Sequence, residues 1–397
     1  MIKPIAPPLT MTRPAMAAGR WPYQRGVVAL ACWLGLALTL EAALHVEGLR
    51  GAALSLLGIA LGLALLQSNF GFAGSFRAAL ERNDYTGFRA QAVALALTST
   101  AFFPLMALGS LFGQPLNGFV APVGISFILG AILFGIGMQI GGGCASGTLF
   151  ALGGGDARLL LTLAFFVLGS AAGAAHLDYW HQLPAFPATT TQDVIGWPLA
   201  LLCHLSIFGA IIWSIPEQSN IKQGTHDLPR SPWTMTQGAI ALAALNTLTL
   251  IVAGRPWGET AGFTLWGSKI AQALGFDAAS WPYWRGDPSA LSRSLFDDMT
   301  TVMDFGILIG AAMAAGLSHR FELRTAGGIR AGLGACIGGC LMGYGARMSD
   351  GCNIGAYFSA LASGSLSGWV WVAAAFAGSA VGLRLRPLFV AAHNPKG

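Results

Sequence analysis

The string GIGMQIGGGCASG at residues 135–147 returns as GYGARMSDGCNIG at residues 343–355, at a constant offset of 208 positions. Each string closes an apolar run and holds one cysteine between glycines. Further along, FFVLGSAAG at 165–173 is matched, after a one-residue slip, by AFAGSAVG at 375–382. Glycines this dense let helices approach closely or break, and duplicated apolar halves with broken helices are typical of membrane transporters.

The composition places the chain in a lipid bilayer. Of its 397 residues 54% are hydrophobic and only 10% are charged, with a mean hydropathy of +0.61. A typical soluble domain has about a quarter of its residues charged. The net charge of +5 is spread over short loops without a basic tract, which argues against a nucleic-acid partner.

Ten apolar runs predict about ten transmembrane helices. The runs lie at about 26–44, 51–67, 90–112, 119–139, 158–175, 196–215, 235–253, 304–318, 329–346 and 368–384. Lysine and arginine collect in every second connection, and the positive-inside rule makes these connections cytoplasmic. We therefore predict an all-α polytopic membrane protein with these parts: a cytoplasmic tail at 1–25, an N-terminal repeat at 26–215, a cytoplasmic linker at 216–234 and a C-terminal repeat at 235–397.

The alternation of basic connections turns the two repeats upside down relative to each other. The span before Cys144 runs inward, and the span before Cys352 runs outward. The apolar pieces that follow the cysteines, 145–152 and 353–362, are too short to cross a core of about 30 Å at about 1.5 Å per residue. We expect two re-entrant half-helices that enter from opposite sides, so that the two cysteines meet near the midplane.

The chemistry expected at this meeting point is anion binding. A helix start presents free N–H groups and the positive end of the helix dipole, and both Cys144 and Cys352 stand at such a start. Soft, polarizable sulfur suits a sulfur-bearing anion better than phosphate. Neighbouring glycines leave the backbone open to an ion: Gly143, Gly147, Gly351 and Gly355.

Other candidates are weaker. Cys336 and Cys340 share a helical face with Arg347, and this face either lines the path or only packs. Arg347 and Asp350 either form an ion pair that braces the loop or contact the substrate. A short run at 261–274 predicts a further re-entrant or interfacial helix, with an aromatic anchor at the outer face as the alternative. The six cysteines form no disulfide framework or zinc spacing, and we expect no cofactor or metal.

The two cysteine strings, together with GRPWG at 254–258 and LWGSK at 265–269, resemble the YeeE/YedE family of sulfur-transport membrane proteins. The similarity covers most of the chain, from about Gly51 to Leu385. The resemblance implies an hourglass-shaped protein of two inverted halves, in which three cysteines along a central path pass thiosulfate from the periplasm to the cytoplasm.

Two of the three family cysteines correspond to Cys144 and Cys352. The third would fall at Gly71, where the family has a cysteine after an aromatic residue and this chain has Phe70 followed by glycine. Either Cys336 or Cys340 supplies a substitute thiol, or the substrate differs.

These observations favour a transporter of a bacterial inner membrane that imports thiosulfate or a close relative and is not an enzyme. The sequence has no ATP-binding motif, so import would follow a gradient maintained by cytoplasmic consumption. The resemblance implies a small TusA-like sulfurtransferase as the consuming partner. Two alternatives stay open: a membrane persulfide carrier that exchanges sulfane sulfur between its cysteines, and a transporter of a selenium oxyanion.

Overall fold

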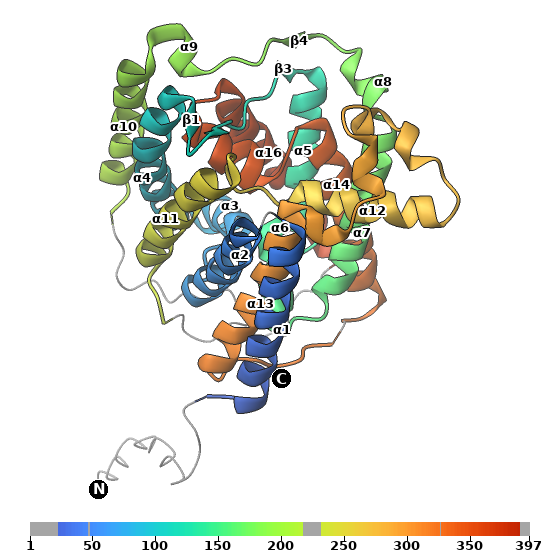
Figure 1. Ribbon diagram of the computed structural model, residues 1–397. Helices are drawn as coiled ribbons and strands as arrows, with labels where there is room; N and C mark the ends of the chain where they lie inside the picture. The colour runs from blue at the N-terminus through green and yellow to red at the C-terminus, as the bar shows by residue number, and fades with distance from the viewer. Residues whose placement is uncertain (1–22, 47, 217–231, 326, 390–397) are drawn as a thin grey trace, which may run out of the picture.

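The computed structural model describes residues 23–46, 48–216, 232–325 and 327–389 (Figure 1). Throughout these ranges the regular structure is mostly helical, and the few strand residues form two small antiparallel pairs. The expected all-α membrane architecture is confirmed. Most of the predicted cytoplasmic tail and linker lies outside the described residues.

Each of the ten expected spans is a helix. They are α1 (Arg25–His45), α2 (Leu49–Ser68), α4 (Thr86–Leu108), α5 (Ile125–Ile140), α7 (Leu159–Ala175), α10 (Trp197–Ser214), α11 (Met235–Ala253), α13 (Met299–Leu317), α14 (Ile329–Met348) and α16 (Leu366–Leu385). Within the described ranges, eight helices are long and apolar enough to cross a membrane. The glycine-rich α14 is not among the eight, and α7 is a shorter apolar helix of 17 residues.

Shorter elements connect the spans. The short helices are α3 (Phe72–Arg82), α6 (Ala145–Gly153), α8 (Leu177–His181), α9 (Thr191–Ile195), α12 (Thr260–Ala273) and α15 (Ala360–Ala362). A π-helical segment, η5 (Asn353–Ser359), precedes α15. The single-turn 3₁₀ elements are η1 (Ala278–Ser280), η2 (Pro282–Trp284), η3 (Pro288–Leu291), η4 (Leu295–Asp297) and η6 (Arg386–Leu388). The strands are β1 (Ser110–Leu111), β2 (Gln114–Pro115), β3 (Val123–Gly124) and β4 (Ala185–Phe186).

The helices pack with two-fold pseudosymmetry. The elements from α2 to α7 correspond in order to those from α11 to α16, and each contact between the halves has a reciprocal one. Helix α7 packs on α14 as α16 packs on α5, α2 packs on α13 as α11 packs on α4, and α5 packs directly on α14. Reciprocal contacts of this kind are the signature of a two-fold axis. Helix α1 likewise packs on α13 as α10 packs on α4.

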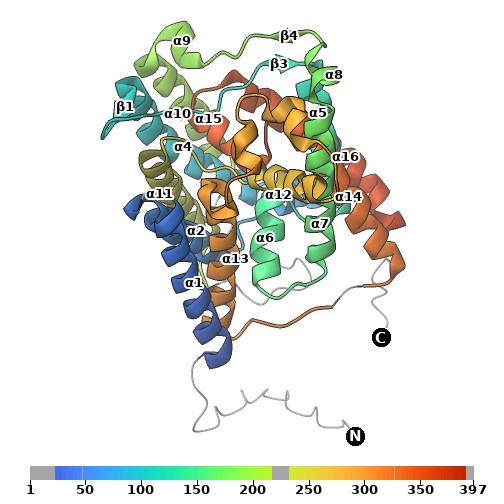
Figure 2. The same cartoon turned by 45° about the vertical axis from the view of Figure 1, so that its right-hand side comes forward.

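Equivalent helices run in opposite directions. Figure 2 shows α5 starting at the end of the molecule where β3 lies, and α14 starting at the opposite end, after the segment that follows α13. Both termini of the described chain lie at that second end (Figures 1 and 2). The duplicated halves are therefore inverted relative to each other.

The repeated glycines make this packing possible. A methyl group at Gly137 of α5 would lie 2.6 Å from the carbonyl oxygen of Gly338 in α14. The equivalent methyl at Gly345 of α14 would lie 2.5 Å from the oxygen of Gly130 in α5. Both residues of the first contact are therefore 208 positions from their equivalents in the second. Only glycine allows backbones to approach so closely, which explains why the glycine pattern is duplicated.

The connections separate into two groups at the two ends of the molecule. The basic connections meet at the end with the termini, through the bonds Gln24 Nε2 to Phe321 O (3.0 Å), Trp233 N to Gln67 O (3.1 Å) and Arg324 N to Gly155 O (2.9 Å). The other connections meet at the opposite end, through Arg50 Nε to Val252 O (2.9 Å), Asn117 N to Gly254 O (2.8 Å) and Thr191 N to Gly364 O (2.8 Å). We call the end with the termini the termini end, and the other end the opposite end.

Candidate functional site

Cys144 caps a broken helix. Helix α5 ends at Ile140, and α6 begins at Ala145 after a short break, close to the half-helix expected at 145–152. The Cys144 Sγ accepts a hydrogen bond from the Gly147 N–H at 3.4 Å and lies 3.4 Å from Ser146 Oγ. The thiol is buried, with 1% of the residue exposed. It therefore stands at the positive start of α6 and out of bulk water.

Cys352 occupies the equivalent place in the second half. It is the N-cap of η5, which continues into α15, so that 353–362 forms the expected second half-helix. The residue is 1% exposed, and its Sγ lies 3.7 Å from the Oε2 of Glu259. The two cysteine thiols are close enough to interact electrostatically. The structure thus brings the two duplicated cysteines together, and π-helical turns such as η5 are frequent at functional sites.

Each cysteine also faces the start of a second short helix. The backbone N–H of Ala73, in the first turn of α3, faces the Cys144 sulfur. Glu259, the N-cap of α12, faces Cys352. Since α3 and α12 are equivalent in the two halves, their N-caps Gly71 and Glu259 are equivalent as well. Four helix starts therefore converge on the cysteines, which favours an anion.

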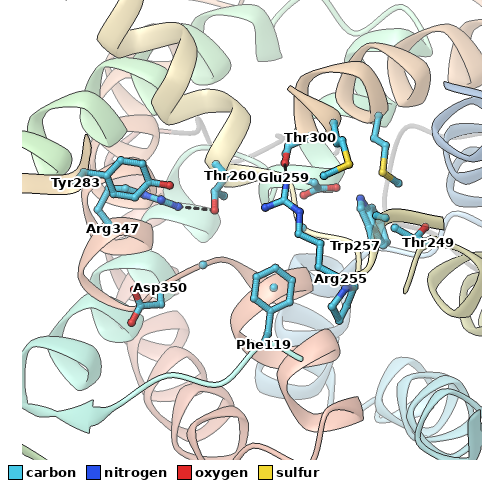
Figure 3. Close-up of a pocket in the computed structure, with 18 residues that line it drawn as sticks. Phe119, Thr249, Arg255, Trp257, Glu259, Thr260, Tyr283, Thr300, Arg347 and Asp350 are labelled. Carbon is cyan, nitrogen blue, oxygen red and sulfur yellow. Dashed lines mark hydrogen bonds between the residues drawn. The ribbon is translucent and has the colours of Figure 1, made fainter. Parts of the chain in front are cut away.

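A pocket lies on the Cys352 side of this centre and has a volume of about 180 Å³ (Figure 3). Its lining includes Phe119, Arg255, Trp257, Glu259, Tyr283, Arg347 and Gly355. The lining comes partly from the connections at the opposite end, which supply Phe119, Arg255 and Tyr283, and partly from α14 and η5, which supply Arg347 and Gly355.

Two arginines give the pocket positive charge. Arg255 donates from Nη2 to the Thr300 Oγ1 at 2.9 Å, and Arg347 donates from Nη2 to the Thr260 Oγ1 at 2.7 Å. The Arg347 guanidinium also lies 5.2 Å from the centre of the Tyr283 ring, within the range of a cation–π contact. Figure 3 shows Arg347 reaching toward Thr260 beside Tyr283. Both guanidiniums hydrogen-bond to neutral hydroxyl groups, and Asp350, which also lines the pocket, is close enough to interact electrostatically with Arg347.

The four predicted glycines serve two purposes. A methyl at Gly147 would lie 3.3 Å from Cys144 Sγ, and one at Gly143 would lie 3.4 Å from the Thr148 N–H nitrogen. Gly351 has φ +155° and leaves no room for a side chain, because a methyl there would lie 2.8 Å from Ala356 N. Gly355 faces the pocket, where a methyl would meet only Phe119 at 3.9 Å. Three glycines therefore keep the helix starts compact, and the fourth keeps the pocket open.

The face predicted on α14 is only partly brought to the site. Arg347 lines the pocket, as does Asp350, and Arg347 bonds to Thr260. Cys336 and Cys340 are half-buried and are not in the pocket lining. They lie eleven and seven residues before Arg347 on α14, about 16 Å and 10 Å along the helix axis. The structure separates these two cysteines from the pocket.

Glu259 is the site residue that the sequence analysis missed. It follows the GRPWG string at 254–258 and precedes the short run at 261–274, and neither motif assigned it a role. The sequence did contain a signal for it. Glu259 directly precedes the apolar run that forms α12, and the equivalent helix of the first half, α3, begins after Gly71. Glu259 and Cys352 are 93 positions apart in the sequence, so no local motif could predict their contact.

Comparison with known proteins points to sulfur transport. A family model described as sulphur transport matches residues 67–381. A thiosulfate transporter of Spirochaeta thermophila, TsuA, is 27% identical over 79% of this chain and 92% of its own length. The thiosulfate transporter TsuA of Escherichia coli is 27% identical over 79% of this chain and 88% of its own length. The probable transporter YedE of Escherichia coli is 33% identical over 40% of this chain and 39% of its own length.

Proposed function

Because the chain belongs to the sulphur-transport family of membrane proteins, we propose that it imports thiosulfate, or a closely related sulfur-containing anion, through a path lined by Cys144 and Cys352. The observation that carries the proposal is the pair of buried thiols, each at the start of a broken helix and each facing a second helix start. The names of the TsuA relatives support thiosulfate as the substrate.

The anion enters from the opposite end. Arg255 and Arg347 attract it into the pocket, and the N–H groups at the start of η5 replace part of its hydration shell. It then passes from the Cys352 thiol to the Cys144 thiol and leaves along α6. Thiols are weak hydrogen-bond donors, so they hold the ion briefly and release it, which conduction requires.

The termini end is cytoplasmic in this proposal, because the basic connections meet there. The two repeats, 26–215 and 235–397, then span a bacterial inner membrane with the pocket on the periplasmic side. A TusA-like sulfurtransferase at the cytoplasmic end would consume the imported sulfur. Arg77 is available near that exit, where its Nε donates to the Gln139 Oε1 at 3.1 Å.

Uptake of labelled thiosulfate into cells tests the cysteine path. Cys144→Ala and Cys352→Ala should each lower uptake at least about tenfold, since a methyl offers no S–H to the ion. The matched controls Cys32→Ala and Cys203→Ala remove exposed thiols outside the site and should leave uptake unchanged. Uptake at the wild-type rate in both site variants, at equal membrane expression, would remove the two cysteines from the path. Stronger competition by unlabelled selenite, sulfite or sulfate than by thiosulfate would change the substrate.

A second function is favoured by one contact. The Glu259 carboxyl beside Cys352 supplies the base that a thiol nucleophile requires. A Cys352 thiolate could attack the outer sulfur of thiosulfate, forming a persulfide and releasing sulfite, with the thiol proton passing to Glu259. The protein would then carry sulfane sulfur instead of the whole ion.

Position-specific labelling separates the two functions. Thiosulfate labelled in its outer sulfur and thiosulfate labelled in its inner sulfur should accumulate equally if the intact ion crosses. Accumulation of the outer label alone, with the inner label left outside as sulfite, would establish the carrier and refute transport of the intact ion. Mass spectrometry of the purified protein after exposure to thiosulfate would show the persulfide as an addition of one sulfur atom.

A further inference from the structure

Two buried carboxyl groups lie beside the path, and three of their four oxygens have no hydrogen-bond partner among the described residues. Glu259 is 1% exposed and Asp304 is 0% exposed. Among the described residues, neither the Oε1 of Glu259 nor either carboxyl oxygen of Asp304 has a hydrogen-bond partner. The other Glu259 oxygen has only the Cys352 thiol, at 3.7 Å. Transport by the cysteines and arginines alone does not account for these two acids.

The two acids belong to one site. Asp304, on α13, lies against the first turn of α12, since a methyl at Gly262 would be 2.7 Å from its Oδ2. Glu259 is the N-cap of the same helix, and the two carboxyls interact electrostatically. Thr300, one helical turn before Asp304, lines the pocket together with Glu259. The pair therefore adjoins the pocket through Glu259 and extends inward through Asp304.

Burial of this kind favours the neutral acids. An ionised carboxylate without a donor is very costly in an apolar interior, and two close carboxylates cannot both stay ionised at low cost. The surroundings contain groups of both signs: Arg255 on the preceding segment, Asp298 on α13, Arg347 on α14, Asp350 in the following loop, and the thiols Cys352 and Cys144. Among the described residues, neither arginine bonds to either acid: Arg255 donates to Thr300 and Arg347 donates to Thr260.

Charge gives a reason for a proton site. Thiosulfate carries two negative charges, so a membrane potential of about 100 mV, negative inside, lowers its equilibrium concentration inside roughly 2,000-fold. One proton that enters with each anion reduces this exclusion to about 50-fold, and two protons remove it. Import without coupled cations would therefore leave the cytoplasm almost empty of the ion.

We propose that Glu259 and Asp304 form the proton-binding site of a proton-coupled anion importer, which rests on the proposed function. When both acids are protonated, the positive potential of the arginines and helix starts prevails at the site, and the dianion binds. With the acids ionised, their charge opposes the anion beside Cys352. Anion and protons therefore bind together, and the coupling is reciprocal, since each raises the affinity for the other.

Reconstitution of the full chain into lipid vesicles tests the proposal in two steps. Exchange of labelled thiosulfate across vesicles at equal pH on both sides reports transport itself. Accumulation driven by an acidic outside, and acidification of a trapped pH dye after thiosulfate is added outside, report coupling. With two protons per anion, one pH unit supports at most about 100-fold accumulation.

Glu259→Gln and Asp304→Asn, which imitate the protonated acids, should each lose accumulation and acidification, and the exchange that remains should no longer depend on pH. The matched control Glu322→Gln changes an acid at the termini end, 74% exposed at its side chain, and should keep all three. Accumulation driven by a sodium gradient in place of the pH gradient would overturn the proton assignment.

The outcomes separate the two proposals. Wild-type vesicles that exchange thiosulfate without internal acidification would overturn the coupling and leave the transport function standing. Wild-type vesicles with no exchange would refute thiosulfate transport, and the coupled mechanism with it. The dye measurement on wild-type vesicles tests proton coupling by itself, so the proposal can be refuted even if a variant fails to fold.

Discussion

The contact between α5 and α14 allows a stability prediction that uses the internal symmetry as its own control. Gly137→Ala would place a methyl 2.6 Å from the Gly338 oxygen, and Gly345→Ala would place one 2.5 Å from the Gly130 oxygen. A carbon and a carbonyl oxygen rarely approach within about 3.3 Å. The helices would have to separate by about 0.7 to 0.8 Å, because backbone atoms cannot rotate away as a side chain can.

The expected cost follows from this separation. Overpacking of a well-packed contact costs about 1 to 3 kcal/mol, and a gap of 0.5 to 1 Å forfeits a quarter to a half of each dispersion contact nearby. Gly209→Ala on α10 is the matched control, since a methyl there meets nothing within 4 Å. Alanine is better than glycine inside a helix by about 0.5 to 1 kcal/mol, so this control should be stabilising.

Thermal unfolding in detergent, followed by size-exclusion of the surviving protein at one fixed heating rate, gives the rank order. Gly137→Ala and Gly345→Ala should both unfold several degrees below the wild type, by similar amounts, and Gly209→Ala at or above it. Uptake should fall in the first two as well, because α5 and α14 lead directly into the cysteine loops. A stable Gly137→Ala beside an unstable Gly345→Ala would refute the equivalence of the two contacts.

Three further outcomes are expected. Gly71→Cys should express and unfold like the wild type, because a Cβ added there meets only the Gly74 nitrogen, at 4.0 Å. If transport requires a third thiol, Gly71→Cys should restore uptake in a Cys336→Ala/Cys340→Ala double variant. Normal uptake in the double variant itself would assign both cysteines to packing. Arg347→Gln should raise the KM for thiosulfate about tenfold or more with a smaller change in maximal rate, and Arg347→Lys should recover part of the loss; an unchanged KM in labelled uptake would exclude the pocket from the path. Single cysteines at Asp193 and Asp287 should react with an impermeant maleimide added to intact cells, and those at Arg158 and Arg324 should react only after lysis, in a background without reactive native thiols; labelling of all four from outside would refute the assigned orientation.

The architecture followed from local features of the sequence. Length and hydropathy predicted ten helices, and the duplicated strings with their constant offset of 208 predicted two equivalent halves. The cysteines at the starts of short apolar pieces predicted the two half-helices, which the structure places at α6 and η5 with α15. The run at 261–274 likewise became α12. Apolar periodicity, helix starts and glycines are properties of neighbouring residues, so they can be recognised without knowledge of the packing.

The chemistry around the cysteines was decided by the tertiary structure. How far each residue of α14 lies from the site depends on where the helix is placed along α5 and α7, so Arg347 lines the pocket, and Cys336 and Cys340 lie on the same face too far along the helix axis to reach it. Glu259 and Asp304 lie 45 positions apart in the sequence, in a connection and a span, and only the packing of α12 and α13 brings them together, with Glu259 beside Cys352. The placement of a helix against its neighbours, like the contact between residues 93 positions apart, is set by how side chains of different helices pack together. No local stretch of sequence encodes this packing.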